Sequence, residues 1–152
     1  MKKILILFAI ILYSSQIFSQ EINYEQKAFD FLRDSIIKHK NKKIYVKTDI
    51  VEWNHFNSAC LKKFNLISTD TINARKTSSK KINLYGNKKI KEVIGIDINY
   101  WNKTILVNRT YRFKDNQYIS GITQKRGRAF TKYLIEMDEN GKIKDWCEYI
   151  SE

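Results

Sequence analysis

Two cysteines are the residues whose type and number most clearly suggest chemistry in this chain. Cys60 and Cys147 are an even pair, and in an oxidising compartment such a pair can form a disulfide. A bridge would close a long loop, for which the chain-entropy model gives about 4 to 5 kcal/mol of stabilisation. The alternative is two buried free thiols that act as small hydrophobic groups. We predict the bridge, which requires the two Cα atoms to lie within about 7 Å.

Metal binding and covalent catalysis have little support in the sequence. The two histidines, His39 and His55, lie far apart and have no Cys or His partner at the spacing of a metal site. His55 and Cys60 could form a thiol–imidazole pair, but residues five apart on a helix do not face each other. We therefore predict no catalytic residues, no metal site and no cofactor.

Two carboxylates in neighbouring predicted strands are candidates for acid–base chemistry. Glu136 and Glu148 are each flanked by polar residues, which favours two solvated surface carboxylates over a catalytic pair. A cavity that holds a desolvated carboxylate near Asp97 or Glu136 would instead indicate an enzyme. The sequence contains no Gly-rich phosphate loop, Gly-x-Ser-x-Gly elbow or His-Glu-x-x-His helix.

Aromatic residues suggest a binding surface. Trp53, Tyr100 and Trp101 could present an exposed surface to sugars or peptides. The alternative is ordinary cross-strand pairing in a twisted sheet, where aromatic residues are common. Aromatic and basic residues in alternation also suit single-stranded nucleic acid, but we do not favour that partner because the chain begins with an export signal.

That signal occupies residues 1–19. A basic start, Lys2-Lys3, precedes an unbroken apolar run over Ile4–Tyr13, and a small polar stretch then leads to Ser19-Gln20. This is the three-part pattern of a secretory signal peptide, and the apolar run is too short to span a bilayer comfortably. We expect cleavage near Ser19-Gln20 and a secreted or periplasmic mature protein. No later apolar run is long enough for a transmembrane segment.

The composition indicates a basic globular domain. The chain has 152 residues, of which 43% are hydrophobic, and a formal net charge of +12. This length can bury a core as one domain, so residues 20–152 are predicted to form a single α+β domain. A basic surface attracts acidic partners. The lysines are nevertheless spread along the chain, which favours a solvated surface over a built patch.

The first half of the domain has helical and extended patterns in turn. Apolar residues fall on one arc at helical spacing over Ile22–Lys40, and Asn23 can cap this helix. Alternation over Ile44–Trp53 predicts a strand, and Phe56–Phe64 return to helical spacing, with Asn54 as a possible cap.

The second half is predicted to be mainly strands. The polar stretch Ser68–Lys81 predicts a long loop, and Ile82–Tyr85 a short edge strand. Alternation then predicts a hairpin of residues 94–100 with 105–113, and further strands over 118–124, 130–137 and 142–150 with a tight turn at Asn140-Gly141. Short turns imply an antiparallel sheet. We therefore predict an α+β fold in which the N-terminal helix packs on a curved antiparallel sheet of about five to six strands.

This layout, which closes with FTKYLIEMDENGKIKDWCEYI, resembles nuclear-transport-factor-2-like (NTF2-like) and cystatin-like domains. It also resembles secreted bacterial proteins that end in a strand, an Asn-Gly-Lys turn and a Trp-bearing strand. The resemblance covers mostly Lys91–Ile150 and implies a helix packed into a curved antiparallel sheet. It carries over no catalytic residue, because fold does not imply function.

Two functions remain open from the sequence. The first is a small, basic, non-enzymatic binding or interaction protein that presents a sheet face or loop to a protein or a glycan. The second is a small hydrolase- or isomerase-type enzyme with a pocket between helix and sheet. A filled core and an exposed aromatic patch would favour the binding protein. We favour it also because the sequence lacks a catalytic constellation.

Overall fold

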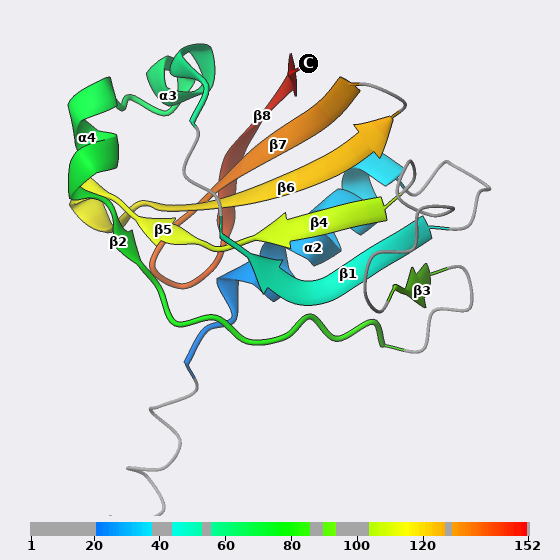
Figure 1. Cartoon of the computed structure of the whole chain (residues 1–152). Helices are drawn as coiled ribbons and strands as arrows, with labels where there is room; N and C mark the ends of the chain where they lie inside the picture. The colour runs from blue at the N-terminus through cyan, green and yellow to red at the C-terminus, as the bar shows by residue number, and fades with distance from the viewer. Residues whose placement is uncertain are drawn as a thin grey trace, which may run out of the picture.

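A computed structural model describes residues 21–37, 44–52, 56–85, 90–93, 104–126 and 129–151. Within them the chain forms an open, mixed sheet of eight strands, and helix α2 lies behind the sheet in the view of Figure 1. The fold class is α+β, as predicted, but the sheet has more strands than expected and is not purely antiparallel. The predicted leader lies outside the described residues.

Helix α2 spans Tyr24–Phe31 and continues as a π-helical turn, η1, over Leu32–Ile37. The α-helical part is therefore shorter than the predicted helix, whose last residues, 38–40, lie outside the described part. Asn23 caps α2 as predicted, since its Oδ1 accepts the Gln26 N–H at 2.9 Å. The apolar side of α2 and one face of the sheet form the first core, which includes Ala28, Phe29, Leu32, Val46, Ile105, Val107, Ile122, Tyr133 and Ile135.

Three long strands form the antiparallel half of the sheet. They are β6 (Tyr118–Arg126), β7 (Ala129–Met137) and β8 (Ile143–Ser151), and each pairs with the next. These strands confirm the predictions for this part of the chain. The turn before β8 lies at Asn140-Gly141, as predicted. Gly141 has φ +74°, and a Cβ at this position would lie 2.9 Å from a methyl group of Ile22. Glycine is therefore the residue that this position accommodates without strain.

The other half of the sheet corrects the antiparallel prediction. Strand β1 (Ile44–Val51) pairs in parallel with both β3 (Ile90–Glu92) and β4 (Thr104–Asn108). Strand β4 in turn pairs antiparallel with β6. A parallel neighbour needs a long connection, and the residues between β1 and β3 provide one. The predicted partner strand over 94–100 lies outside the described residues.

Short elements raise the number of strands above the prediction. The strand predicted over 105–113 is interrupted at Arg109-Thr110, so that β5 (Tyr111–Arg112) is a separate strand that pairs with β6 and with β2 (Arg75–Lys76). Residues 82–85, predicted as an edge strand, are not a strand: residues 82–84 have no regular secondary structure and Tyr85 lies in a turn.

Two short helices lie before and within the predicted polar loop. Helix α3 spans Ser58–Lys63 and α4 spans Ser68–Asn73, so the stretch predicted as a loop contains a helix and β2. Asn57 caps α3 by accepting the N–H groups of Ala59 and Cys60 at 2.9 and 3.3 Å. The cap is therefore Asn57 and not Asn54, which lies outside the described residues.

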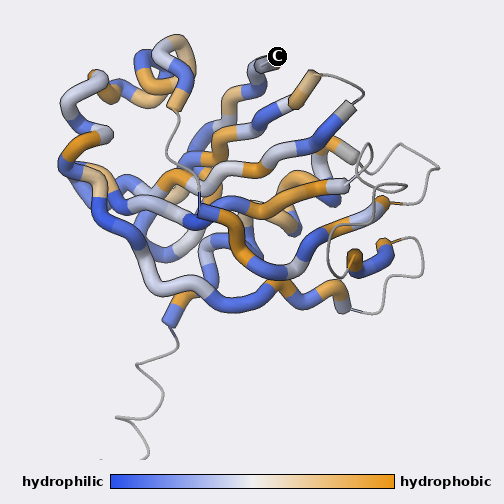
Figure 2. The backbone as a smooth tube through the Cα atoms, in the orientation of Figure 1, coloured by the Kyte–Doolittle hydropathy of each residue, from blue (hydrophilic) through white to orange (hydrophobic). Residues whose placement is uncertain are grey.

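The second core lies on the sheet face opposite α2. Successive residues of a strand point to opposite faces: in β7, Tyr133 and Ile135 belong to the first core and Leu134 to the second. Figure 2 shows hydrophobic residues distributed along the strands of the sheet. The second core joins α3 to the sheet and consists of Cys60, Leu61, Phe64, Leu66, Tyr111, Phe113, Ile119 and Leu134. None of the helices in the described part is long and apolar enough to cross a membrane.

Candidate functional site

The candidate site is a groove beside β1 and β3, with the segment Lys81–Tyr85 as one wall. It is a shallow groove, open to solvent, with a volume of about 490 Å³. Residues from β1, β3 and this segment line it: Thr48, Lys81, Ile82, Asn83, Leu84, Tyr85 and Glu92.

Apolar anchors hold the wall segment against the domain. Ile82 is buried in the first core and Leu84 packs against that core, while the Ile82 N–H donates to the Thr48 carbonyl at 3.0 Å. Asn83, between these anchors, and Tyr85, directly after Leu84, are exposed. The segment thus has one side fixed to the protein and the other available to a ligand.

Helix α2 fixes the same segment through a two-way amide contact. Gln26 Oε1 accepts the Asn83 N–H at 2.8 Å, and Gln26 Nε2 donates to the Asn83 carbonyl at 3.1 Å. Gln26 is itself buried, so the contact is shielded from water. This is how a glutamine side chain can substitute for a neighbouring strand: it satisfies both backbone groups of one residue.

Tyr85 is the most unusual residue of the groove. Its φ is +38°, an uncommon conformation for a bulky side chain, and its N–H donates to Asn83 Oδ1 at 3.0 Å, which closes an Asx-type turn. The ring is 66% exposed. Backbone strain of this kind is concentrated at ligand-binding and other functional positions, so the turn presents an aromatic ring to solvent at an energetic cost.

Glu92 provides the charge of the groove. The buried Thr48 hydroxyl donates to Glu92 Oε1, and Lys81 Nζ lies 3.1 Å from the same oxygen. The hydrogen bond from Thr48, followed by that from Lys81, lowers the pKa of the Glu92 carboxyl. Glu92 is therefore an ionised hydrogen-bond acceptor at neutral pH and is poorly suited to donate a proton as a general acid.

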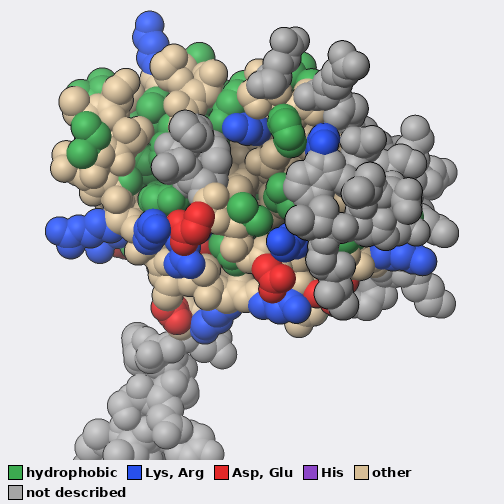
Figure 3. Space-filling model, in the orientation of Figure 1, with side chains coloured by type: hydrophobic (Ala, Val, Ile, Leu, Met, Phe, Trp, Pro, Cys, Tyr) green, Lys and Arg blue, Asp and Glu red, His purple; other side chains and the backbone are tan. Residues whose placement is uncertain are grey.

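Ion pairs with Glu52 offset the positive charge of two basic residues, Lys76 and Arg109. Glu52 lies 2.9 Å from Lys76 Nζ and 2.7 Å from Arg109 Nε, and the hydrogen bond from Lys76 lowers the pKa of the Glu52 carboxyl. Figure 3 shows acidic side chains lying against basic ones on this face of the molecule. Glu52 thus offsets part of the basic charge on this face of the molecule.

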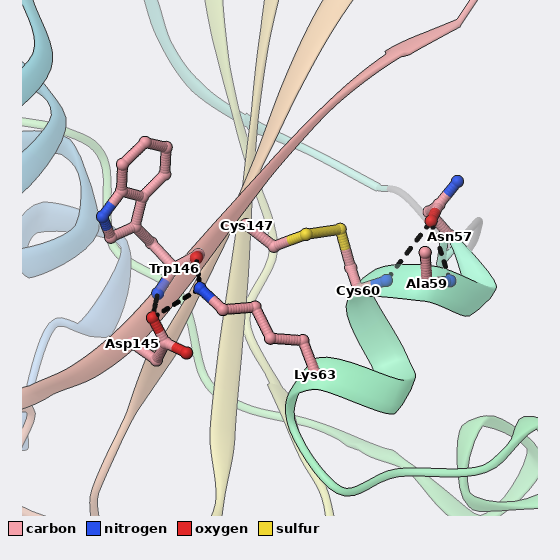
Figure 4. Close-up of a disulfide and its surroundings, with 7 residues drawn as sticks. All are labelled: Asn57, Ala59, Cys60, Lys63, Asp145, Trp146 and Cys147. Atoms are coloured by element: carbon pink, nitrogen blue, oxygen red, sulfur yellow. Dashed lines mark hydrogen bonds and ion pairs between the residues drawn. A yellow bond between two sulfur atoms is a disulfide. The ribbon is translucent and has the colours of Figure 1, made fainter.

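The disulfide is present and joins the second core to the edge of the sheet (Figure 4). Cys60 and Cys147 are bonded, with their Cα atoms 5.6 Å apart, so α3 is tied to β8. Lys63, on the same helix, donates to Asp145 Oδ1 at 2.7 Å and to the Trp146 carbonyl at 2.6 Å. No group of three or more His, Cys, Asp or Glu side chains that could hold a metal ion occurs within the described residues.

The other residues singled out in the sequence do not meet at one site. Glu136 is buried and accepts a hydrogen bond from Gln117 Nε2 at 2.7 Å, which corrects the expectation of a solvated surface carboxylate, while Glu148 is exposed. Glu136 lies opposite Asp145, and Glu148 lies opposite Tyr133, so the two do not pair. A separate group falls outside the described residues: Trp53, Tyr100, Trp101, His39, His55 and Asp97.

Sequence reasoning missed the groove because nothing in the pattern marks it. Residues 82–85 have the alternation of a short strand, and alternation does not report that Gln26 takes the place of a neighbouring strand. Comparison with known proteins adds no family to this description: no family model, curated protein or solved structure matches the chain.

Proposed function

We propose that the chain is an exported, disulfide-bonded binding protein whose groove takes a saccharide. The observation that carries the proposal is the presentation of Tyr85, a strained, exposed aromatic ring above a groove with an ionised carboxylate. A sugar ring has an apolar face and a polar edge. An aromatic face packs on the former, while Glu92, Lys81 and Asn83 supply acceptors and donors for the hydroxyl groups.

Export is supported by two independent features. Residues 1–19 have the pattern of a signal peptide, and the Cys60–Cys147 bond belongs to an oxidising compartment. These features support the proposal of a secreted or periplasmic location. The likeness to NTF2-like and cystatin-like domains stays a prediction, and the parallel pairing of β1 departs from an all-antiparallel sheet.

The alternative of an enzyme with a pocket between helix and sheet receives less support. That space is filled by side chains of the first core, among them Ala28, Leu32, Val46, Ile105 and Val107, all with no exposed surface. A filled core is one of the two features expected to favour a binding protein. The other, an exposed aromatic patch with Trp53, Tyr100 and Trp101, lies outside the described residues. The carboxylate of the groove also has a lowered rather than a raised pKa, unlike a general acid that works near neutral pH.

A glycan array probed with the labelled mature protein tests the proposal. We expect at least one saccharide to bind, and we expect Tyr85→Ala to weaken that binding by about tenfold or more, since a lost aromatic contact of about 1.4 kcal/mol corresponds to tenfold. The matched control is Ile72→Ala, which removes another exposed hydrophobic side chain, 82% exposed, from the distant helix α4. Equal binding by wild type and Tyr85→Ala, or no bound saccharide, would contradict the proposal.

A further inference from the structure

The first turn of α2 anchors three separate segments through three consecutive residues. The Tyr24 hydroxyl donates to the Glu139 carbonyl at 2.8 Å, in the turn between β7 and β8. Glu25 Oε1 accepts the Thr110 N–H at 2.8 Å, at the interruption between β4 and β5. Gln26 holds Asn83 of the groove wall. A change at any one of these residues therefore acts on a turn that also positions the other two.

Glu25 is the unusual member of this group. Its side chain has no exposed surface, and neither has that of Thr110. Glu25 Oε2 and Thr110 Oγ1 are both buried and have no hydrogen-bond partner within the described residues. An ionised carboxylate with an unpaired buried oxygen is costly, and such a group takes up a proton instead. The protonated form also gains an O–H donor, which the ionised form lacks.

The surroundings of Glu25 offset only part of the effect of burial. Burial raises the pKa of the Glu25 carboxyl, and the Thr110 N–H, the backbone of Glu25 itself, the nearby Thr110 hydroxyl and the Arg109 charge oppose the shift without cancelling it. Arg109 is the charged group that acts on Glu25 from the facing strands. Its Nε is already 2.7 Å from Glu52 Oε1, and its Nη1 donates to the Thr77 carbonyl at 3.0 Å. Two of the guanidinium nitrogens are thus already engaged by oxygens other than those of Glu25.

We propose that Glu25 is a pH-sensitive latch that fastens the first turn of α2 to the Arg109-Thr110 interruption when its carboxyl is protonated and loosens it when the carboxyl ionises. Ionisation introduces a charge with an unpaired oxygen into a closed site, and the site opens to let water reach it. Because Gln26 follows directly on the same turn, opening also weakens its hold on Asn83 and on the groove wall.

The sign of the pH dependence follows from linkage. The folded state binds the Glu25 proton more tightly than the unfolded state does, so this residue lowers stability as the pH rises. The free energy of unfolding begins to fall near the ordinary glutamate pKa of about 4.3. It stops falling once the pH exceeds the raised pKa of the folded state, and Glu25 causes no further change at higher pH. This is the reverse of an ion-paired carboxylate, which loses stability as the pH falls.

Two nuclear magnetic resonance measurements on the folded mature protein test the latch without any ligand. The first follows the carboxyl carbon of Glu25 from about pH 4 to pH 9, and we expect its midpoint above the ordinary glutamate range. The second follows amide hydrogen exchange of Asn83 and Thr110, corrected for the intrinsic rate. We expect exchange at both amides to speed up about tenfold or more across the Glu25 titration.

Glu25→Gln is the decisive variant, because glutamine keeps an acceptor for the Thr110 N–H, supplies an N–H donor and cannot ionise. We expect its Asn83 and Thr110 exchange to be flat with pH. Glu148→Gln, at an exposed carboxylate on β8, is the matched control and should follow the wild type. A Glu25 midpoint in the ordinary range, or the same pH profile in Glu25→Gln and wild type, would overturn the latch. The Glu25 titration needs no variant, so it decides the question even if Glu25→Gln folds poorly.

Discussion

The two faces of the sheet are held in different ways. On the first face, α2 packs into a core of fully buried apolar side chains, and its first turn reaches three separate segments. On the second face, α3 has only six residues, and a disulfide and the Lys63–Asp145 ion pair fasten it to β8. So short a helix is not stable alone. On the second face, the disulfide provides part of the attachment between helix and sheet that apolar packing provides on the first face.

Removing a large side chain from the first core should have the largest effect. Phe29 is 1% exposed in α2, and Phe64 is 2% exposed at the end of α3. We expect Phe29→Ala to lower the free energy of unfolding by about 3 to 5 kcal/mol. We expect less from Phe64→Ala, because α3 can settle onto the sheet while the disulfide holds it. Urea unfolding of both variants measures the difference, and an equal or larger loss in Phe64→Ala would contradict it.

Removing the disulfide should have the next largest effect. The bond joins residues 87 positions apart, and we expect Cys60→Ala with Cys147→Ala to lower the free energy of unfolding by about 2 to 4 kcal/mol. The loss should be uneven: amide protection in α3 should fall, while protection in α2 should persist. Hydrogen exchange measures both helices in one experiment. Equal losses in the two helices would show that the faces do not differ as described.

Removing the helix caps should have the smallest effect and gives the sharpest comparison. Asn23 caps α2 and Asn57 caps α3, and replacing either with alanine should cost about 1 kcal/mol in the oxidised protein. In the variant without cysteines, the cost of Asn57→Ala should shrink because α3 is already released, while that of Asn23→Ala should stay the same. A double-mutant cycle by urea unfolding tests this coupling. An undiminished cost for Asn57→Ala would mean that α3 stays docked without the disulfide.

The antiparallel half of the sheet could be predicted from the sequence because its strands, its turns and its strand pairing all depend on residues that are close together in the chain. In β6, β7 and β8, alternation marks each strand, and Asn140-Gly141 marks the turn between the last two. Each strand then pairs with its neighbour in the sequence. Asn23 was predictable for the same reason, since the residue that caps α2 lies directly before it.

The parallel half could not be predicted in this way. Alternation over Ile44–Val51 marks a strand but not its direction or its neighbours, and β1 pairs with strands that are far along the chain. The interruption at Arg109-Thr110 was missed because the buried partner of Thr110 is Glu25, 85 positions away. The groove was missed for the same reason, since Asn83 is held by Gln26, which is 57 positions away.

The proposed function requires that the chain is exported and held by the Cys60–Cys147 bond. The most direct test is the intact mass and N-terminal sequence of the protein purified without reductant from its native envelope fraction. We predict a mature chain that begins near Gln20, contains no free thiol and is two hydrogen atoms lighter than the reduced form. A chain that retains Met1 and carries two free thiols would contradict it.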